Sequence, residues 1–159
     1  MNMLEHIEEM AREVMTSMSD IVWSIDARHD RYSDLIDRMR DFAFKVLSIK
    51  SITLTINDHG IKKEHLSPEL RQNMYMIFKE AIHNVIKHAN ATSVELNLMQ
   101  THHHLEMTIR DNGKGIQPSP HHIGHGLKNM YLRAGRVKGT LEILNDHGTV
   151  VKLKIPLRS

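Results

Sequence analysis

Residues 78–91 read FKEAIHNVIKHANA, and the fold and the candidate site both depend on this stretch. It continues a helical period that starts at Ser67-Pro68-Glu69, where a capping hydroxyl precedes proline at the first helical position. The apolar face of the predicted helix, which runs from about Pro68 to Ala89, consists of Leu70, Met74, Phe78, Ala81, Ile82 and Val85. A polar stripe roughly opposite consists of Glu80, Asn84, Lys87 and His88. Taken alone, such a stripe indicates a solvated helix face.

Two glycine motifs follow this helix. Residues 111–116 read DNGKGI and come directly after an alternating strand that ends at Arg110. The ionised carboxylate of Asp111 can accept a hydrogen bond from an exocyclic amine, and the glycines allow backbone to approach a flat ligand. By itself, a D-N-G sequence predicts only an Asx turn.

Residues 124–127 read GHGL and open a short predicted helix. Free backbone N–H groups at a helix N-terminus bind phosphate, although a lone G-x-G is weak support for such a site. The segment 116–123, which joins the two glycine motifs, is long enough for a mobile lid.

The N-terminal 25 residues carry a heptad pattern. Its apolar positions are Leu4, Ile7, Ala11, Val14, Met18, Ile21 and Ile25. This spacing fits either a seam for a partner helix or an amphipathic helix folded onto its own domain. The pattern is already in phase at Leu4, which favours a partner helix.

The remaining periodicity predicts an α+β fold. We expect a helix over residues 35–47, a strand over 52–56 with a turn at 57–60, a hairpin over 94–109, a short helix over 127–134 and a hairpin over 140–155. The chain shows no internal repeat. Helices beside a largely antiparallel sheet are the arrangement that this order favours.

Composition excludes several classes of function. The 159 residues include no cysteine, so a disulfide framework, a thiol nucleophile and a Cys-type zinc site are excluded, and a reducing cytoplasm fits. No apolar run reaches the ~20 residues that cross a bilayer. A net charge of +2 and 4% aromatic residues argue against nucleic acid as a partner. The histidine run 102–104 and the histidines at 121, 122 and 125 fit solvated turns better than a zinc site.

The order of the motifs resembles that of the GHKL ATPases. FKEAIHNVIKHANA (78–91), DNGKGI (111–116) and GHGLKNMYLRAGRVKGTLEI (124–143) are similar to the N box and the glycine boxes of bacterial sensor histidine kinases. Residues 19–47, SDIVWSIDARHDRYSDLIDRMRDFAFKVL, resemble the segment joining dimerisation helices to the ATP-binding domain in a subfamily with short dimerisation helices, common in Bacteroidetes-type two-component sensors. The resemblance implies the Bergerat fold, a two-layer α/β sandwich with helices on one face of a mixed, mainly antiparallel sheet.

The resemblance also implies a role for each matching residue in ATP and Mg²⁺ binding. Asn84 would be the Mg²⁺ ligand, and Glu80 would orient or deprotonate the attacking group. Asp111 would accept a hydrogen bond from the exocyclic amine of adenine, and the hydroxyl of Thr149 would support the adenine site. The remaining implied nucleotide-binding residues are Lys87, His88, Gly113, Gly115, Ile116, Gly124, His125, Gly126 and Leu127.

The implied reaction transfers the γ-phosphoryl group of ATP to a histidine on a dimerisation helix. No H box stands in this chain: His29-Asp30 lies in the joining segment, and Ile follows His6. Residues 1–28 are therefore interpreted as the remnant of a second dimerisation helix with the joining segment, and residues 29–159 as the catalytic domain. The stretch 145–149 is shorter than in many relatives, which weakens the assignment of Thr149.

The expected partners are ATP, the dimerisation helices of a parent kinase and, indirectly, a response regulator. A weak homodimer through residues 4–25 is also expected, with no membrane contact by this chain. The expected location is the cytoplasm, with a parent protein that an inner membrane could anchor. Two alternatives remain: a nucleotide-sensing or scaffolding module without phosphotransfer, and an anti-sigma-type serine kinase.

Overall fold

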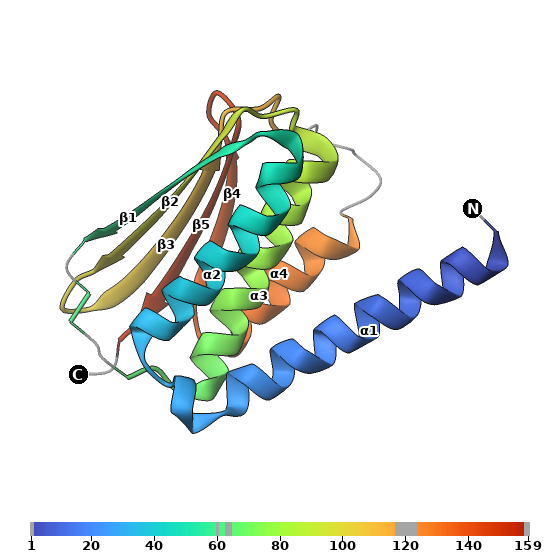
Figure 1. The fold of residues 1–159 in the computed structure, drawn as a ribbon. Coiled ribbons are helices and arrows are strands. Elements are labelled where there is room, and N and C mark those ends of the chain that lie inside the picture. Colours follow the sequence, from blue (N-terminus) through green and yellow to red (C-terminus); the bar gives the residue numbers. More distant parts are fainter. Residues whose placement is uncertain (1, 60, 63–64, 117–123, 158–159) are drawn as a thin grey trace.

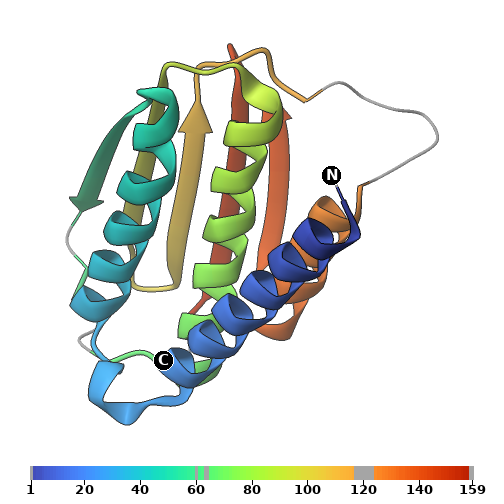
Figure 2. The ribbon, with the colours of Figure 1, turned by 45° about the vertical axis from the view of Figure 1, so that its right-hand side comes forward.

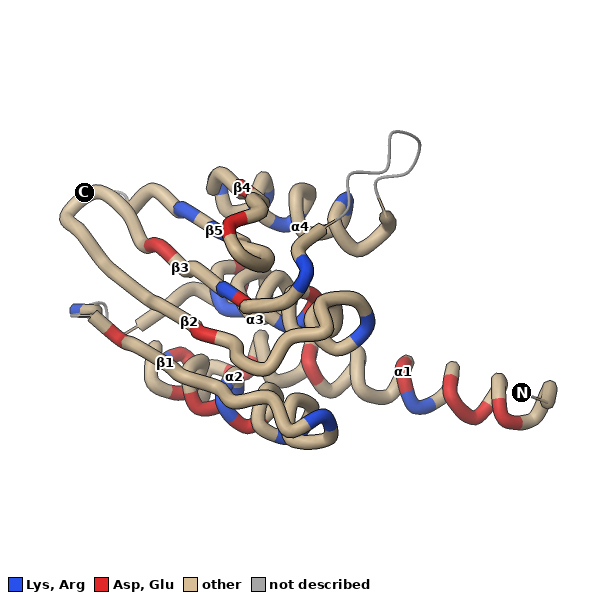
Figure 3. The backbone as a smooth tube through the Cα atoms, turned by 90° about the horizontal axis from the view of Figure 1, so that it is seen from above, with Lys and Arg blue, Asp and Glu red and all other residues tan. Residues whose placement is uncertain are grey.

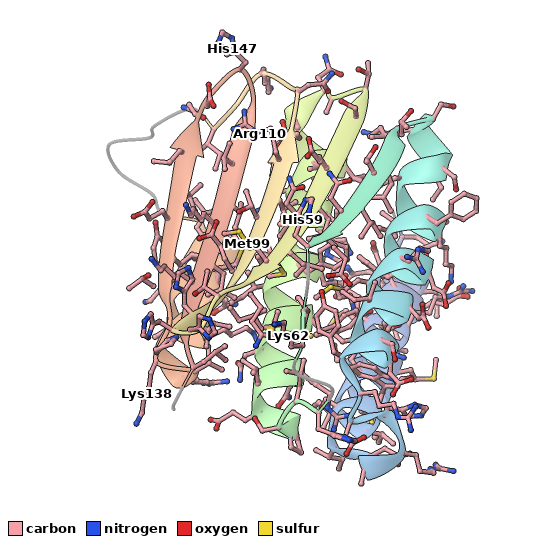
Figure 4. All side chains as sticks on the ribbon, turned by 90° about the vertical axis from the view of Figure 1, so that its left-hand side faces the viewer. His59, Lys62, Met99, Arg110, Lys138 and His147 are labelled. Atoms are coloured by element: carbon pink, nitrogen blue, oxygen red, sulfur yellow. The ribbon has the colours of Figure 1, made fainter. Side chains whose placement is uncertain are left out.

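The computed structural model describes residues 2–59, 61–62, 65–116 and 124–157, and it forms two layers. Three helices, α2 (Tyr32–Leu47), α3 (Pro68–Asn84) and α4 (His125–Arg136), cover one face of a five-stranded sheet (Figures 1 and 2). In the part of the chain that the structure describes, no helix lies on the other face (Figure 4). The predicted α+β sandwich with helices on one face is therefore confirmed.

The sheet has the order β1-β2-β3-β5-β4. Its strands are β1 (Thr53–His59), β2 (Ser93–Gln100), β3 (His104–Asp111), β4 (Thr140–Asn145) and β5 (Thr149–Pro156). β1 pairs with β2 in parallel and every other pairing is antiparallel. The parallel pair requires a crossover, and α3 supplies it between β1 and β2. The mixed, mainly antiparallel sheet is as predicted.

The core lies between the sheet and the helices. Leu96 and Leu98 of β2 and Leu153 of β5 face Phe78 and Ile82 of α3, and all five side chains are fully buried. Burying a large apolar side chain contributes about 1.5–3 kcal/mol, so this interface stabilises the position of α3 over the sheet. Ser67 caps that helix, because its Oγ accepts from the Leu70 N–H at 3.2 Å.

Two local predictions differ from the structure. Residues 57–59 belong to β1 instead of a turn, because the Asn57 amide donates to Glu95 Oε1 at 3.0 Å and Asn97 Oδ1 at 2.9 Å on β2. The helix predicted to Ala89 is α-helical only to Asn84, and its last turn, Val85–Ala89, is π-helical. It ends at Asn90, which adopts a left-handed conformation with φ 55°.

Helix α1 (Met3–Ile25) projects from the body, as Figures 1 and 3 show. Its heptad positions stay exposed: Leu4 is 76% exposed, Val14 57% and Met18 61%. The interpretation that this seam folds onto its own domain is therefore wrong. The buried residues of α1 are instead the polar Asp20 and Ser24, near its C-terminal end.

Buried ion pairs join that end of α1 to the domain. Asp20 is 4% exposed, and its carboxylate contacts Arg38 Nη2 of α2 at 2.6 Å and Lys79 Nζ of α3 at 2.7 Å. The Arg38 guanidinium also stacks on Trp23, at 4.7 Å from the ring centroid. Because Lys79 directly precedes Glu80, α1 is anchored beside the polar stripe of α3.

Arg71 of α3, fully buried, completes this anchor. Its guanidinium donates to the carbonyl oxygen of Ser24 at 2.6 Å, and also to those of Asp26 and His29. These carbonyls belong to the last turn of α1 and the short 3₁₀ turn Ala27–His29. The joining segment is thus held by backbone contacts.

Among the described residues, no helix has both the length and the apolar character that crossing a lipid bilayer needs.

Candidate nucleotide-binding site

A pocket of about 550 Å³ lies between the C-terminal end of α3, the end of β3 and the start of α4. The polar stripe predicted on the long helix lines this pocket, so it is more than a solvated face. The predicted residues that line it are Glu80, Asn84, Lys87, His88, Asp111, Gly115, Ile116, Gly124, His125, Gly126, Leu127 and Thr149. Gly113 is the one predicted site residue outside this lining.

The π-helical turn places the charged end of the stripe. Asn84 is the last α-helical residue, and Lys87 and His88 follow in the wider turn with exposed side chains. Single π-helical turns are frequent at functional sites. The turn brings the Ala89 carbonyl to the Asp111–Gly115 loop, where it accepts from the Lys114 N–H at 2.8 Å.

Asp111 lies at the end of β3 and is 4% exposed. Its Oδ1 accepts from the Gly113 N–H at 2.8 Å and from the Thr149 N–H at 3.2 Å. Thr149 therefore contacts Asp111 through its backbone N–H, and the support of the adenine site by its hydroxyl, which the resemblance implies, stays a prediction. An ionised carboxylate accepts several hydrogen bonds and donates none, so Oδ2 can serve an amine in the pocket.

Gly113 supports the pocket from beneath. A Cβ atom there would lie 2.1 Å from the Ala89 carbonyl oxygen, so only glycine allows the loop to pack on the π-helical turn. Its N–H is also one of the two donors to Asp111. Gly113 thus determines the shape of the pocket without lining it.

Helix α4 begins at the edge of the pocket. Its N-cap is Gly124, which has no side chain to make a capping hydrogen bond, so the described residues leave the first N–H groups of the helix available. Gly126 lies close to α3, because a Cβ atom there would lie 1.9 Å from Glu80 Oε1, the end of a flexible side chain. The carboxylate of Glu80 and the N-terminus of α4 are therefore direct neighbours.

His83 lies outside this pocket, although the same motif contains it. Its ring packs edge-on against Phe42 at 5.5 Å between centroids. Burial lowers the pKa of His83, and the charge of Lys79 lowers it further. A neutral His83 adds no positive charge to the pocket, which leaves Lys87, Lys114 and the start of α4 as the features that attract an anion.

Sequence reasoning missed two asparagines beside the pocket. Asn112 Oδ1 accepts from the N–H groups of Thr92 and Ser93 at 2.9 and 3.0 Å, which ties the loop to β2. Asn145, at the end of β4, contacts the backbone of Ile116. The D-N-G pattern could have suggested the first contact, since Asn in turns commonly bonds backbone. No local pattern marks Asn145.

The predicted lid lies largely at residues 117–123, outside the described residues, as do His121 and His122. Within the described residues, no group of three or more histidine or acidic side chains could hold a metal ion. His102 and His103 are exposed in the turn between β2 and β3, as predicted, whereas His104 is the first residue of β3 and is half-buried.

Oxygen donors suit Mg²⁺, which keeps several waters and takes few protein ligands when phosphates are present. Asn84 supplies a half-buried carboxamide in the pocket, one turn after the carboxylate of Glu80. The donor set therefore fits one protein ligand to a phosphate-bound Mg²⁺. It does not fit a cation held by protein alone.

Sequence comparison finds relatives of this chain among sensor histidine kinases. The signal transduction histidine-protein kinase/phosphatase UhpB of Salmonella typhimurium is 37% identical over 101 residues, which are 64% of this chain and 20% of that protein. The sensor histidine kinase YvfT of Bacillus subtilis is 37% identical over 92 residues, 58% of this chain and 24% of that protein. The chain thus spans a quarter or less of these relatives.

Solved structures share the fold. The histidine kinase domain from the Erythrobacter litoralis EL346 blue-light activated kinase aligns with 98% of this chain and 86% of that one, at a TM-score of 0.69 and 18% identity. The Acinetobacter baumannii histidine kinase AdeS aligns with 98% of this chain and 82% of that one, at a TM-score of 0.71 and 13% sequence identity. Residues 69–159 match the family described as "Histidine kinase-, DNA gyrase B-, and HSP90-like ATPase". This match covers α3, the pocket and β2 to β5, and the chain belongs to that family of ATPases.

Proposed function

We propose that this chain is the ATP-binding catalytic domain of a two-component sensor histidine kinase. The observation that carries the proposal is the pocket in which Glu80, Asn84 and Asp111 meet the N-terminus of α4. An adenine acceptor, an oxygen ligand for Mg²⁺ and a carboxylate lie around one space. Similarity to named sensor kinases, and the family match over residues 69–159, support the same assignment.

Each residue has a distinct task in this proposal. Asp111 accepts from the exocyclic amine of adenine, and the first N–H groups of α4 bind phosphate oxygens with help from the helix dipole. Lys87 adds a point charge, and Asn84 holds Mg²⁺ through its amide oxygen. Bound Mg²⁺ neutralises phosphate charge as it develops during transfer.

Glu80 acts on the acceptor. The bond from the γ-phosphorus to the bridging oxygen breaks, a bond to an imidazole nitrogen forms, and ADP leaves. Glu80 orients the imidazole and takes the proton from the ring nitrogen that does not attack, which leaves the phosphorylated imidazole neutral. Positioning and charge neutralisation account for most of the rate in such transfers. The acceptor histidine lies on a dimerisation helix, and a response regulator receives the phosphoryl group next. ATP supply places this reaction in the cytoplasm.

Calorimetric titration tests nucleotide binding directly. We expect ATP and a non-hydrolysable analogue to bind with micromolar to millimolar affinity, and more tightly with Mg²⁺ than with EDTA, because the metal screens phosphate charge. AMP lacks the phosphates that meet α4 and should bind more weakly. An isotherm without heat for all three ligands would contradict the proposal and favour a scaffolding module.

The exposed seam of α1 supports a homodimer through residues 4–25. Its seven apolar positions are exposed, and acidic residues recur along the same helix (Figure 3). Three heptads form only a marginal two-stranded coil, so we expect a concentration-dependent monomer–dimer equilibrium in analytical ultracentrifugation. Val14→Lys should shift it toward monomer. Identical sedimentation of both proteins at every concentration would exclude this seam as the interface.

A further inference from the structure

The turn between β4 and β5 packs on the loop that carries Asp111. A Cβ atom at Gly148, which has φ 136°, would lie 1.9 Å from the Asp111 carbonyl oxygen, so the two backbones are in direct contact. The Thr149 N–H reaches Asp111 Oδ1 in the same region. Arg110 and His147 mark this end of the sheet in Figure 4. The turn therefore shapes the adenine end of the pocket.

Asn145 makes the most specific contact of this turn. Its Oδ1 accepts from the Ile116 N–H at 2.8 Å, and its Nδ2 donates to the Ile116 carbonyl at 2.7 Å. One carboxamide thus satisfies both backbone groups of one residue, as a neighbouring strand would do. A carboxylate could not donate, and an aliphatic side chain could do neither.

The neighbouring Gly115 is shaped for this contact. Its φ is 77°, and a Cβ atom there would lie 2.7 Å from Asn145 Oδ1. Gly115 and Ile116 both line the nucleotide pocket, whereas Asn145 does not. Asn145 can therefore affect a bound nucleotide only through the position of the Gly115–Ile116 segment.

We propose that Asn145 is a positioning residue for the nucleotide, holding Gly115 and Ile116 as one wall of the pocket by a two-point hydrogen bond. The inference rests on the proposed function, because it treats that pocket as the ATP site. Asn112 holds the other end of the same loop on β2, so the loop lies between two carboxamide clamps. Without Asn145, ATP binding must also order the Gly115–Ile116 wall.

Two variants test the inference. Asn145→Leu keeps the approximate side-chain volume and removes both hydrogen bonds, and we expect ATP affinity to fall about 10-fold. The matched control is Asp146→Asn, which alters an exposed ion pair with Arg110 in the same turn and leaves Ile116 untouched. The affinity of Asp146→Asn for ATP should stay within about 2-fold of the wild-type value. Calorimetry supplies both values.

Hydrogen exchange at the Ile116 amide separates positioning from general destabilisation. In the nucleotide-free protein, this amide should exchange about 10-fold faster in Asn145→Leu than in wild type, while amides of β2 and β3 stay unchanged. Faster exchange at Ile116 together with unchanged ATP affinity would overturn the inference and leave the proposed function intact. Wild-type protein that binds no ATP would contradict the proposed function itself, and the inference with it.

Discussion

Asp111→Asn should weaken ATP binding at least about 100-fold, because the variant presents a donor where the nucleotide also presents one. In the structure, Asp111 Oδ1 is already engaged by the N–H groups of Gly113 and Thr149. An asparagine would keep its oxygen on these two donors, which leaves its NH₂ group facing the adenine amine. The substitution is nearly isosteric, so the loop itself should remain folded.

Calorimetric titration of ATP into both proteins, with Mg²⁺, measures the loss. Asp58→Asn is the matched control, since it removes an exposed carboxylate from β1, the edge strand that β2 separates from β3, and Asp58 does not line the pocket. It should bind ATP like wild type. If Asp111→Asn bound ATP with wild-type affinity and folded normally, the adenine would lie elsewhere and the assignment of Asp111 would be wrong.

Glu80→Gln should lower phosphoryl transfer about 1,000-fold and change ATP affinity by less than about 3-fold. A positioned general base contributes about 10²- to 10⁴-fold, and glutamine cannot accept the imidazole proton. Glutamine has nearly the same shape, so it should fit beside Gly126, where the space around Glu80 Oε1 is limited. Binding should persist because Asp111, Asn84 and the start of α4 are unchanged.

The measurement uses ATP labelled at the γ-phosphoryl group and the acceptor helices of the parent kinase, added as a separate polypeptide. Glu142→Gln provides the control, because Glu142 is an exposed carboxylate on β4. Undiminished transfer by Glu80→Gln would remove Glu80 from the reaction. Equal loss of binding and transfer would make it a binding residue instead, and transfer to serine would favour the anti-sigma-type alternative.

Much of the fold could be predicted because its elements are encoded by local periodicity. The alternating residues of β2 and β3 lie in one hairpin, and the cap at Ser67 starts α3 where expected. Residues 57–59 were mispredicted as a turn, since Asn and Asp favour turns unless a neighbouring strand satisfies their side chains. That neighbour is β2, whose residues paired with 57–59 lie 40 positions further along the sequence.

The N-terminal helix illustrates a different limit. Its heptad pattern correctly predicts a helix with an apolar seam, and the structure leaves this seam exposed. The pattern contains no information on which polar residues attach the helix to the domain. Asp20, Lys79 and Arg38 are distant in sequence, and ordinary surface charge is the usual interpretation of each one alone. Only their meeting in a buried cluster makes them an anchor.

The sequence alone determined the helix of Glu80 and Asn84, the strand that ends at Asp111 and the glycines that open α4, because backbone preference and side-chain periodicity act over a few residues. The tertiary structure alone decided that these segments surround one pocket, that Thr149 contacts Asp111 through its backbone, and that Asn145 holds Ile116. These last contacts join residues 29 to 38 positions apart. They depend on how β4 and β5 are placed in the sheet, and that placement results from packing across the whole core.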